Sequence, residues 1–434
     1  TFFQNIYQLS PAHLMKFSIK KNILSKPERY WWPSIKKNSE INFVEAKKII
    51  KEKIKKNINI HLRSDVPVGF MLSGGIDSSS IVCVAKNINK NPSINTFSYV
   101  AENTAFNEKK WIDIINKKVG AVDRKFLAKD TNILENIEQI IYSQGEPFRD
   151  TSIVAQYLVC KMAKSFGIKV LLEGQGADEL FAGYNGYPAS RLLSLFEEKK
   201  YLTAIKFIIA WSRQPNRSLI KIIKLIIKEI LPSKLLNLLL IFTEKNNKPK
   251  WINYKKLESI GVKCQIPKSL IGEKSKGRNL VATLRKNLCE GGLLSLLRHG
   301  DRNSMSNSIE SRMPFLTHDL VDYVLTLPED FLISDTGKTK YILRESMREI
   351  VPDEILNRKD KIGFKTPDKK WIKLLEPKIL SWIKNLDQMP FINKNAAKKI
   401  ITNELKKKGE LKQETWRIIN FCKWYEVMKV DLKD

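Results

Sequence analysis

The sequence has few of the residues that build disulfide frameworks, zinc sites or membrane spans. It contains only five cysteines and four histidines in 434 residues, and the cysteines lie far apart with no Cys-x-x-Cys pair. This spacing favours reduced, mostly buried thiols, and so few histidines leave little for a zinc site or a histidine-based triad. No apolar run reaches the roughly 18 residues that a membrane-spanning helix needs. We therefore expect a cytoplasmic protein without a membrane segment.

Acidic residues are also scarce relative to basic ones. The chain has 76 Lys and Arg against 46 Asp and Glu, a formal net charge of +30. Such a charge is typical of proteins that bind nucleic acid. Here the excess is spread along the chain as Lys beside abundant Ile and Asn, without an Arg-rich arm or a long block of like charge. We interpret it as a compositional bias and expect no nucleic-acid partner.

Predicted strands and helices alternate along the first part of the chain. Strands are expected at 66–72, 94–100, 124–128 and 168–173, and helices at 42–62, 78–88, 107–119, 132–142 and 151–166. This alternation predicts an α/β fold, a parallel sheet with helices on both faces, followed by a mostly helical C-terminal region. Residues 1–20 alternate like paired strands around Ser10-Pro11, and 24–38 is predicted as an extended linker.

The stretch from Met71 to Ser79 reads MLSGGIDSS and joins a predicted strand to a predicted helix. Gly74 and Gly75 remove Cβ atoms that would keep the backbone away from an anion, so successive N–H groups can converge on phosphate oxygens. Ser73 and Ser78 add hydroxyl donors, and Asp77 can hold the Mg²⁺ that accompanies a nucleotide. An ordinary strand-to-helix turn needs only one glycine and one hydroxyl. The stretch therefore predicts a pyrophosphate loop.

A second glycine-rich turn, EGQGADELFAGY over residues 173–184, also follows a predicted buried strand. It carries the adjacent carboxylates Asp178 and Glu179. Carboxylates beside a phosphate loop would repel ATP unless Mg²⁺ lay between them, so we predict that Asp178 pairs with Asp77 as a two-sided cation clamp. The alternative is that Asp178 and Glu179 only place negative charge at a helix N-terminus.

Two later segments carry further candidates. Residues 301–316 mix polar and apolar side chains ahead of Pro314 and are predicted to be a loop lining a pocket, with Glu310 and Arg312 as candidate substrate contacts. Residues 358–364, RKDKIGF, form a cationic loop in which Lys361 can neutralise a departing pyrophosphate. Gly337-Lys338-Thr339 mimics the end of a Walker A loop, but Leu332 stands where the first glycine must be, so we predict a turn.

These segments, in this order and at these separations, resemble the synthetase domain of glutamine-dependent asparagine synthetases, over roughly residues 40–430. The first loop is shared by several nucleotide α-hydrolases of the PP-loop type, whereas the stretches GQGADELF and ESRMPFL are much narrower. By the resemblance, residues 1–38 would be the tail of an N-terminal glutaminase domain plus linker, and 39–434 an ATP-dependent synthetase domain with a helical variable region at 190–300. The cysteine that hydrolyses glutamine is missing from this sequence, so we expect this chain to use free ammonia.

The resemblance implies conversion of aspartate to asparagine through β-aspartyl-AMP, with AMP and pyrophosphate as products and ATP and Mg²⁺ as cofactors. Nitrogen would come from glutamine in the full-length protein, and a homodimer fits this reading. The residue roles that it implies are pyrophosphate binding by Ser73, Gly74, Gly75, Asp77, Ser78 and Ser79, metal binding by Asp77 and Asp178, adenosine contacts from Leu72, Tyr99, Glu173 and Gly174, and catalysis by Lys361, Gln175 and Glu179.

Two positions depart from the family pattern, Gln175 and Thr317, and Thr317 stands where an Asp is common. The Glu that supports adenylate formation in the family is Gln175 here, and an amide cannot accept a proton or offer negative charge. The role must be dispensable or supplied by a neighbour such as Glu173. Gln175 and the variable region leave open an amide ligase that adenylates another carboxylate, a sugar acid or a peptide. A PP-loop enzyme that modifies tRNA is a further alternative, although no RNA-binding module is evident.

Overall fold

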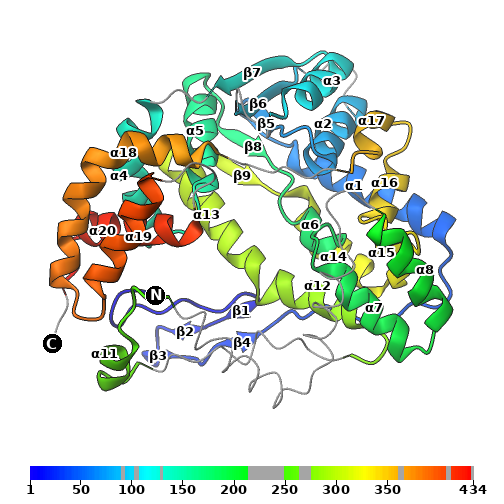
Figure 1. Cartoon of the computed structure of the whole chain (residues 1–434). Helices are drawn as coiled ribbons and strands as arrows, with labels where there is room; N and C mark the ends of the chain where they lie inside the picture. The colour runs from blue at the N-terminus through cyan, green and yellow to red at the C-terminus, as the bar shows by residue number, and fades with distance from the viewer. Residues whose placement is uncertain are drawn as a thin grey trace.

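The computed structural model describes residues 1–88, 93–101, 107–127, 131–213, 249–262, 275–359, 366–406 and 412–431. Its centre is a five-stranded parallel sheet (Figure 1), in the order β7-β6-β5-β8-β9. The strands are β5 (Val68–Met71), β6 (Asn95–Val100), β7 (Val122–Leu127), β8 (Val170–Leu172) and β9 (Glu310–Arg312). The predicted parallel sheet is therefore confirmed.

Helices cover both faces of the sheet, as predicted. Phe70 and Leu72 point into one core and Met71 into the other, because successive side chains of a strand alternate between faces. The first core includes α1 (Phe43–His61), α2 (Ile76–Ile88) and α3 (Lys109–Val119); the second includes α4 (Thr131–Gln144) and α5 (Ser152–Ser165). Burial on both faces explains why these strands are nearly continuous apolar runs.

Local sequence sets the limits of these helices. At the start of α1, the Asn42 side chain accepts a hydrogen bond from the Glu45 N–H, a regular N-cap. The buried residues Ala46, Ile50, Ile54 and Ile58 then recur every four positions along one face. At the end of α3, Gly120 takes the left-handed conformation that commonly stops a helix. The helices and strands expected between residues 42 and 173 are each present, with ends shifted by a few residues.

The order in which the chain adds strands to the sheet reverses beside β5. It lays down β6 and β7 on one side of β5 and then returns to place β8 on the other. Ligands of such sheets bind outside the carboxyl ends of the strands at this switch point. The segments that leave β5 and β8 are the two predicted glycine loops, so the topology brings them together.

The prediction of a loop over 301–316 is wrong. Residues 301–306 end helix α13 (Gly292–Ser306), Glu310–Arg312 is the edge strand β9, and Pro314–Leu316 is the 3-10 helix η2. The strand escaped prediction because three polar residues show no alternation. An edge strand of this sheet tolerates them, since Glu310 and Arg312 keep partial access to solvent.

The N-terminal segment forms two small antiparallel pairs, in a place different from the predicted one. β1 (His13–Leu14) pairs with β4 (Glu28–Arg29), and β2 (Phe17–Ser18) pairs with β3 (Ile23–Leu24). The strands therefore do not pair around Ser10-Pro11, and the predicted linker contributes β4 and the last residue of β3. The polypeptide after β4 is fastened to the helices: Arg285 donates to the Pro33 carbonyl and Arg278 to the Ile35 carbonyl.

The remaining described helices lie mostly beyond the sheet, as expected. They are α6 (Ala177–Leu180), α7 (Tyr187–Glu197), α8 (Tyr201–Ser212), α11 (Tyr254–Ser259), α12 (Asn279–Cys289), α14 (His318–Thr326), α15 (Glu329–Leu332), α16 (Tyr341–Ser346), α17 (Asp353–Leu356), α18 (Asp368–Trp382), η3 (Ile383–Gln388), α19 (Lys394–Lys406) and α20 (Gln413–Val427). Trp371, Trp382, Trp416 and Trp424 are core residues. Among the described residues, no helix combines the length and apolarity that a membrane crossing requires.

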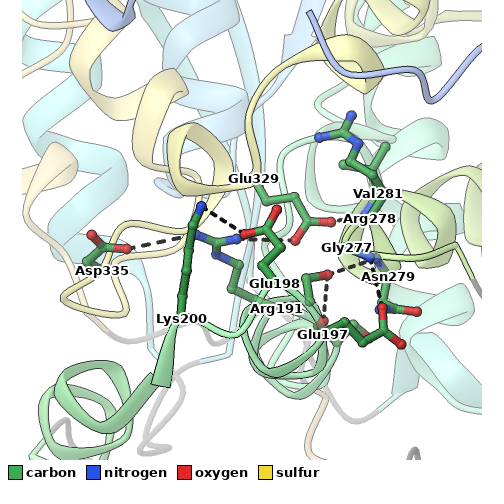
Figure 2. A network of polar contacts seen from close by, with 12 residues as sticks. Arg191, Glu197, Glu198, Lys200, Gly277, Arg278, Asn279, Val281, Glu329 and Asp335 are labelled. Atoms are coloured by element: carbon green, nitrogen blue, oxygen red, sulfur yellow. Dashed lines mark hydrogen bonds and ion pairs between the residues drawn. The ribbon is translucent and has the colours of Figure 1, made fainter. Parts of the chain in front are cut away.

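A buried polar network joins α7, α12 and α15 (Figure 2). Glu329 accepts a hydrogen bond from the Val281 N–H at 3.1 Å and pairs with Arg191 at 3.4 Å. Burial raises the pKa of the Glu329 carboxyl, with Arg191 acting in the opposite direction. Arg278 donates to the carbonyls of Leu325 and Leu327, both at 2.6 Å. These contacts give the Glu329 carboxylate and the Arg278 guanidinium partners inside the protein and connect the three helices to one another.

Candidate nucleotide site

The two glycine loops touch at Gly174. A Cβ atom added to Gly174 would lie 2.9 Å from the Asp77 Cβ and 3.0 Å from the Ser78 nitrogen. Any side chain at this position would therefore push the loops apart. Glycine at 174 lets the carboxyl ends of β5 and β8 present one continuous surface.

The first loop is closed by its own hydroxyls. The Ser73 N–H donates to Ser78 Oγ at 3.2 Å, and the two serine Oγ atoms are also 3.2 Å apart. Ser78 Oγ lies 3.3 Å from the Gly75 carbonyl oxygen, to which it donates. The loop therefore holds its shape without a ligand, which lowers the entropy cost of binding one. Ser79 is fully buried on α2, and its Oγ has no hydrogen-bond partner in the described chain.

The two glycines of this loop have different surroundings, and Gly74 has a packing role in addition to the phosphate binding that stays a prediction. A Cβ on Gly74 would lie 2.6 Å from the Trp111 Cβ, and its φ is +70°. Gly74 is thus required by the close approach of α3 and by its backbone conformation. A Cβ on Gly75 would meet only Ser73 Oγ, at 3.4 Å. The open side of the loop is therefore at Gly75.

The predicted pairing of Asp77 with Asp178 is present, but a lysine joins them. Lys340 Nζ lies 2.6 Å from both carboxylate oxygens of Asp77 and 2.8 Å from Asp178 Oδ1. Lys340 is only 4% exposed. Burial opposes its charge, but Asp178 and Asp77 favour it more strongly and raise the pKa of the ammonium. The two acidic loops thus share one buried cation.

The donor set suits Mg²⁺ carried by a nucleotide. Mg²⁺ is usually bound through one or two carboxylates together with substrate phosphates. Asp77 and Asp178 supply two carboxylates from the two glycine loops, the first of which is predicted to bind phosphate. No group of three or more His, Cys, Asp or Glu side chains within metal-binding reach occurs among the described residues. The pair therefore fits a metal that brings most of its own ligands.

The predicted adenosine contacts lie at the same sheet edge, with different exposure. Leu72 is 1% exposed in the first core, and Tyr99 is 8% exposed in the second. Burial raises the pKa of the Tyr99 hydroxyl, and Asp368 adds to the shift. Their side chains lie on opposite faces of the sheet, so backbone atoms are the groups that both residues could offer to one ligand.

Glu173 is turned into the protein interior. Its carboxylate accepts hydrogen bonds from Ser311 at 2.6 Å and from Gln156 at 3.1 Å. Burial raises the pKa of this carboxyl, and these two donors act in the opposite direction. Glu179 is also buried and accepts from the Tyr184 hydroxyl at 2.6 Å. Gln175, by contrast, is half-buried and makes no side-chain hydrogen bond within the described chain.

The other candidates are placed as follows. Arg312 pairs with Glu310 at 2.7 Å and donates to the carbonyls of His61 and Arg63, both at 2.7 Å. These contacts tie β9 to the end of α1, and a substrate role for Glu310 and Arg312 stays a prediction. Lys361 lies outside the described residues.

Sequence reasoning missed two residues that shape this site. The first is Lys340, directly after the turn at 337–339 that mimics a Walker A loop; the turn itself is confirmed by the bridge between Ile333 and Thr339. The second is Arg358, which donates to the Gly74 carbonyl at 3.1 Å and to Glu108 at 2.8 Å. In a lysine-rich chain no local signal distinguishes Lys340. Arg358 belongs to the cationic segment 358–364, for which the sequence predicted a role for Lys361 but no contact of Arg358 with the first glycine loop.

A separate cavity of about 480 Å³ lies between the N-terminal strands and helices α12 to α14. Its lining is mainly apolar and includes Trp31, Trp32 and Leu297. Neither glycine loop contributes to it. Leu316, at its edge, packs against Gly176, where an added Cβ would lie 2.2 Å from Leu316 Cδ2. The cavity is therefore separated from the second loop by Leu316 and is distinct from the candidate nucleotide site.

Comparison with known proteins identifies the family. The family profile described as Asparagine synthase matches residues 50–426. Asparagine synthetase [glutamine-hydrolyzing] 1 of Bacillus subtilis is 30% identical over 400 residues, covering 88% of this chain and 60% of that protein. A putative asparagine synthetase [glutamine-hydrolyzing] of Mycobacterium bovis is 28% identical over 365 residues, covering 81% and 52%. Amidase chyE of Penicillium rubens is 24% identical over 470 residues, covering 95% and 66%.

The chain therefore spans about 60% of the length of the Bacillus relative that it matches. The profile match begins within α1, ends within α20 and includes both glycine loops. Since the match covers most of the sequence, the chain belongs to the asparagine synthase family.

Proposed function

We propose that this chain is the ATP-dependent part of an asparagine-forming ligase. The observation that carries the proposal is the meeting of the two loops at the sheet's switch point, with Asp77 and Asp178 sharing one cation beside a preformed phosphate loop. The names of the Bacillus and Mycobacterium relatives support asparagine as the product. Residues 39–434 would form the synthetase domain, and 1–38 the tail and linker of a glutaminase domain.

The proposed chemistry has two displacement steps. An oxygen of the aspartate β-carboxylate attacks the α-phosphorus of ATP, and pyrophosphate leaves. Ammonia then attacks the acyl carbon, loses a proton, and AMP leaves with the transferred oxygen. Activation is needed because hydroxide is a poor leaving group from a carboxylate, whereas AMP is a good one.

The residues would share this work. Backbone N–H groups from 73–77 and the hydroxyls of Ser73 and Ser78 would hold the pyrophosphate unit. Asp77 and Asp178 would hold Mg²⁺, which when bound offsets the charge of the phosphates. Lys361 would stabilise the charge that develops on departing pyrophosphate.

An oxygen-transfer experiment tests the adenylate. Aspartate labelled with ¹⁸O in its β-carboxylate is supplied with MgATP and ammonium chloride, and AMP is analysed by mass spectrometry. One labelled oxygen should appear in each AMP formed together with asparagine. Formation of ADP, or of unlabelled AMP alongside asparagine, would contradict the proposed chemistry.

A second candidate keeps the adenylation and changes the acid. Gln175 in place of the family Glu, and the match to a fungal amidase over most of the chain, favour considering it. The discriminating measurement is release of AMP and pyrophosphate with a panel of carboxylic acids. Stimulation by a sugar acid or a peptide carboxylate, without stimulation by aspartate, would select this candidate.

A further inference from the structure

Lys340 stands where a metal ion between the two aspartates would stand. Its Nζ is within 2.8 Å of three oxygens from Asp77 and Asp178. Mg²⁺ binds oxygen at about 2.0 to 2.1 Å, so it would need the same space between these oxygens. Two cations at this separation repel strongly, above all where solvent is largely excluded. The ammonium and a metal ion therefore cannot both use this position.

The backbone around Lys340 has two unusual features that allow its ammonium to lie between the aspartates. Lys340 has φ +53° and ψ 35°, a left-handed conformation that is uncommon for a residue with a side chain. Glycine at 183 leaves space for the contact between Asp178 and Lys340. A Cβ added at this position would lie 1.9 Å from Asp178 Oδ1 and 2.3 Å from Lys340 Cε. Such features persist only where the surrounding structure favours them.

Two nearby basic residues direct their hydrogen bonds to other groups, although Arg344 still feels the charges of Asp77 and Asp178. Arg344 donates to the carbonyls of Thr339 and Leu356, at 2.9 and 2.5 Å. Lys338 pairs with Glu345 at 3.1 Å. Lys340 bridges the two aspartates directly, at 2.6 and 2.8 Å, and its charge offsets two like charges in a mostly buried place.

We propose that Lys340 is an internal counter-ion that occupies the cation position between Asp77 and Asp178 until a nucleotide brings its own metal. The nucleotide-free chain then binds no divalent metal at these aspartates, and arrival of the metal–nucleotide complex moves the ammonium away from them. Lys340 is thus a positioning residue that makes metal binding depend on the nucleotide. This inference rests on the proposed nucleotide site.

The test uses Mn²⁺ as a paramagnetic probe, followed by electron paramagnetic resonance without nucleotide. With wild-type chain the spectrum should remain that of free Mn²⁺. Lys340→Met should bind one Mn²⁺, with an affinity at least about tenfold greater than that of wild type. Lys338→Met, which removes a neighbouring lysine, should behave as wild type. The double variant Lys340→Met/Asp178→Asn should lose the binding again, which locates the ion at the aspartates.

Addition of α,β-methylene ATP is the second arm. Wild type should then bind Mn²⁺, since the analogue supplies phosphate ligands and displaces the ammonium. Wild-type binding of Mn²⁺ at the aspartates without nucleotide, as tight as in Lys340→Met, would overturn the inference. If Lys340→Met is unfolded without metal, Mn²⁺ should restore its circular dichroism; no recovery would also overturn it.

The outcomes separate this inference from the proposed function. If wild type fails to bind the metal–nucleotide complex at all, the nucleotide site is wrong. If it binds the complex and Mn²⁺ binding is unchanged by Lys340→Met, only the counter-ion inference is wrong. No measurement in this series contains aspartate, so the identity of the acid does not affect it.

Discussion

Single buried charges determine the shape of the phosphate loop. Arg358 lies under this loop and links it to the segment before α3, because it contacts both the Gly74 carbonyl and the Glu108 carboxylate. Arg358 and Glu108 are both buried, at 8% exposure each. Removing one partner of a buried ion pair leaves the other charge without compensation, which costs more than the pair contributes.

Arg358→Ala should therefore lower the free energy of unfolding by about 3 to 5 kcal/mol. Urea denaturation of both proteins measures the difference. Lys394→Ala, which removes an exposed partner of Asp387, is the control and should leave stability unchanged. Equal stability of Arg358→Ala and wild type would show that this contact does not support the loop.

Lys361→Ala should lower turnover by roughly 10²- to 10³-fold, the usual loss when one preorganised charge is removed from a developing anion. Affinity for ATP should change less, because the stabilisation arises mainly in the transition state. The neighbouring exposed Lys359 provides the control, and Lys359→Ala should stay within about twofold of wild type. Steady-state kinetics of both variants measure these effects. A similarly small effect for Lys361→Ala would show that Lys361 has no role in turnover.

Among the structural elements, the turn after α6 is packed against the acidic pair. Gly183→Ala should disrupt the contact of Asp178 with Lys340, since the added methyl would overlap the Asp178 carboxylate. We expect turnover to fall by about 10²-fold, as for a displacement of about 1 Å in a site. Gly186→Ala is a matched control three residues away, where an added Cβ meets nothing within 4 Å. Equal kinetics for the two variants would contradict this account.

A chain of hydrogen bonds connects four elements behind the second loop. It runs from His299 on α13 to Gln144 on α4, back to Asn303 on α13, then to Gln156 on α5 and Glu173 after β8. Each donor in it meets an acceptor at 2.7 to 3.1 Å. Because the network is buried and connected, the protonation of one member affects the whole.

His299 should make stability depend on pH. Burial, assisted by Arg298, lowers the pKa of His299 from 6.5 to about 4. Below pH 6.5 the unfolded chain therefore binds a proton that the folded chain refuses, so stability is full above that pH and is lost as pH falls towards 4. His299→Asn should reduce the loss between pH 7 and 4 by on the order of 2 kcal/mol, after allowance for solvent screening. Parallel urea denaturations measure it; identical pH profiles would exclude this role.

For the molecule as a whole, ligand binding should be linked to global stability. The proposed site combines residues 73–78, 173–178 and 340, and Asp77 and Lys340 are 263 positions apart. The unfolded chain cannot hold these groups together, so a ligand of this site binds only the folded state. Mg²⁺ with α,β-methylene ATP at about 100 times its Kd should add about 2.7 kcal/mol.

Differential scanning fluorimetry should then show a clear rise in Tm with this analogue. Asp77→Asn/Asp178→Asn should show a much smaller rise, because the variant keeps the glycines and serines of the first loop but lacks both proposed metal ligands. A wild-type Tm that does not respond to the analogue would contradict the proposed site.

The amino-acid sequence was enough to predict the parallel α/β architecture, the two glycine loops and the approach of Asp77 to Asp178. These features follow from short-range patterns: apolar periodicity, glycine at tight turns, and the rule that ligands gather at the carboxyl ends of parallel strands. Three further features are visible only in the folded chain: β9 is a strand, Gly74 makes room for α3, and Lys340 bridges the aspartates. The physical reason is that each of these depends on contacts between distant segments, and one lysine among 76 basic residues carries no local mark of the charges it will meet.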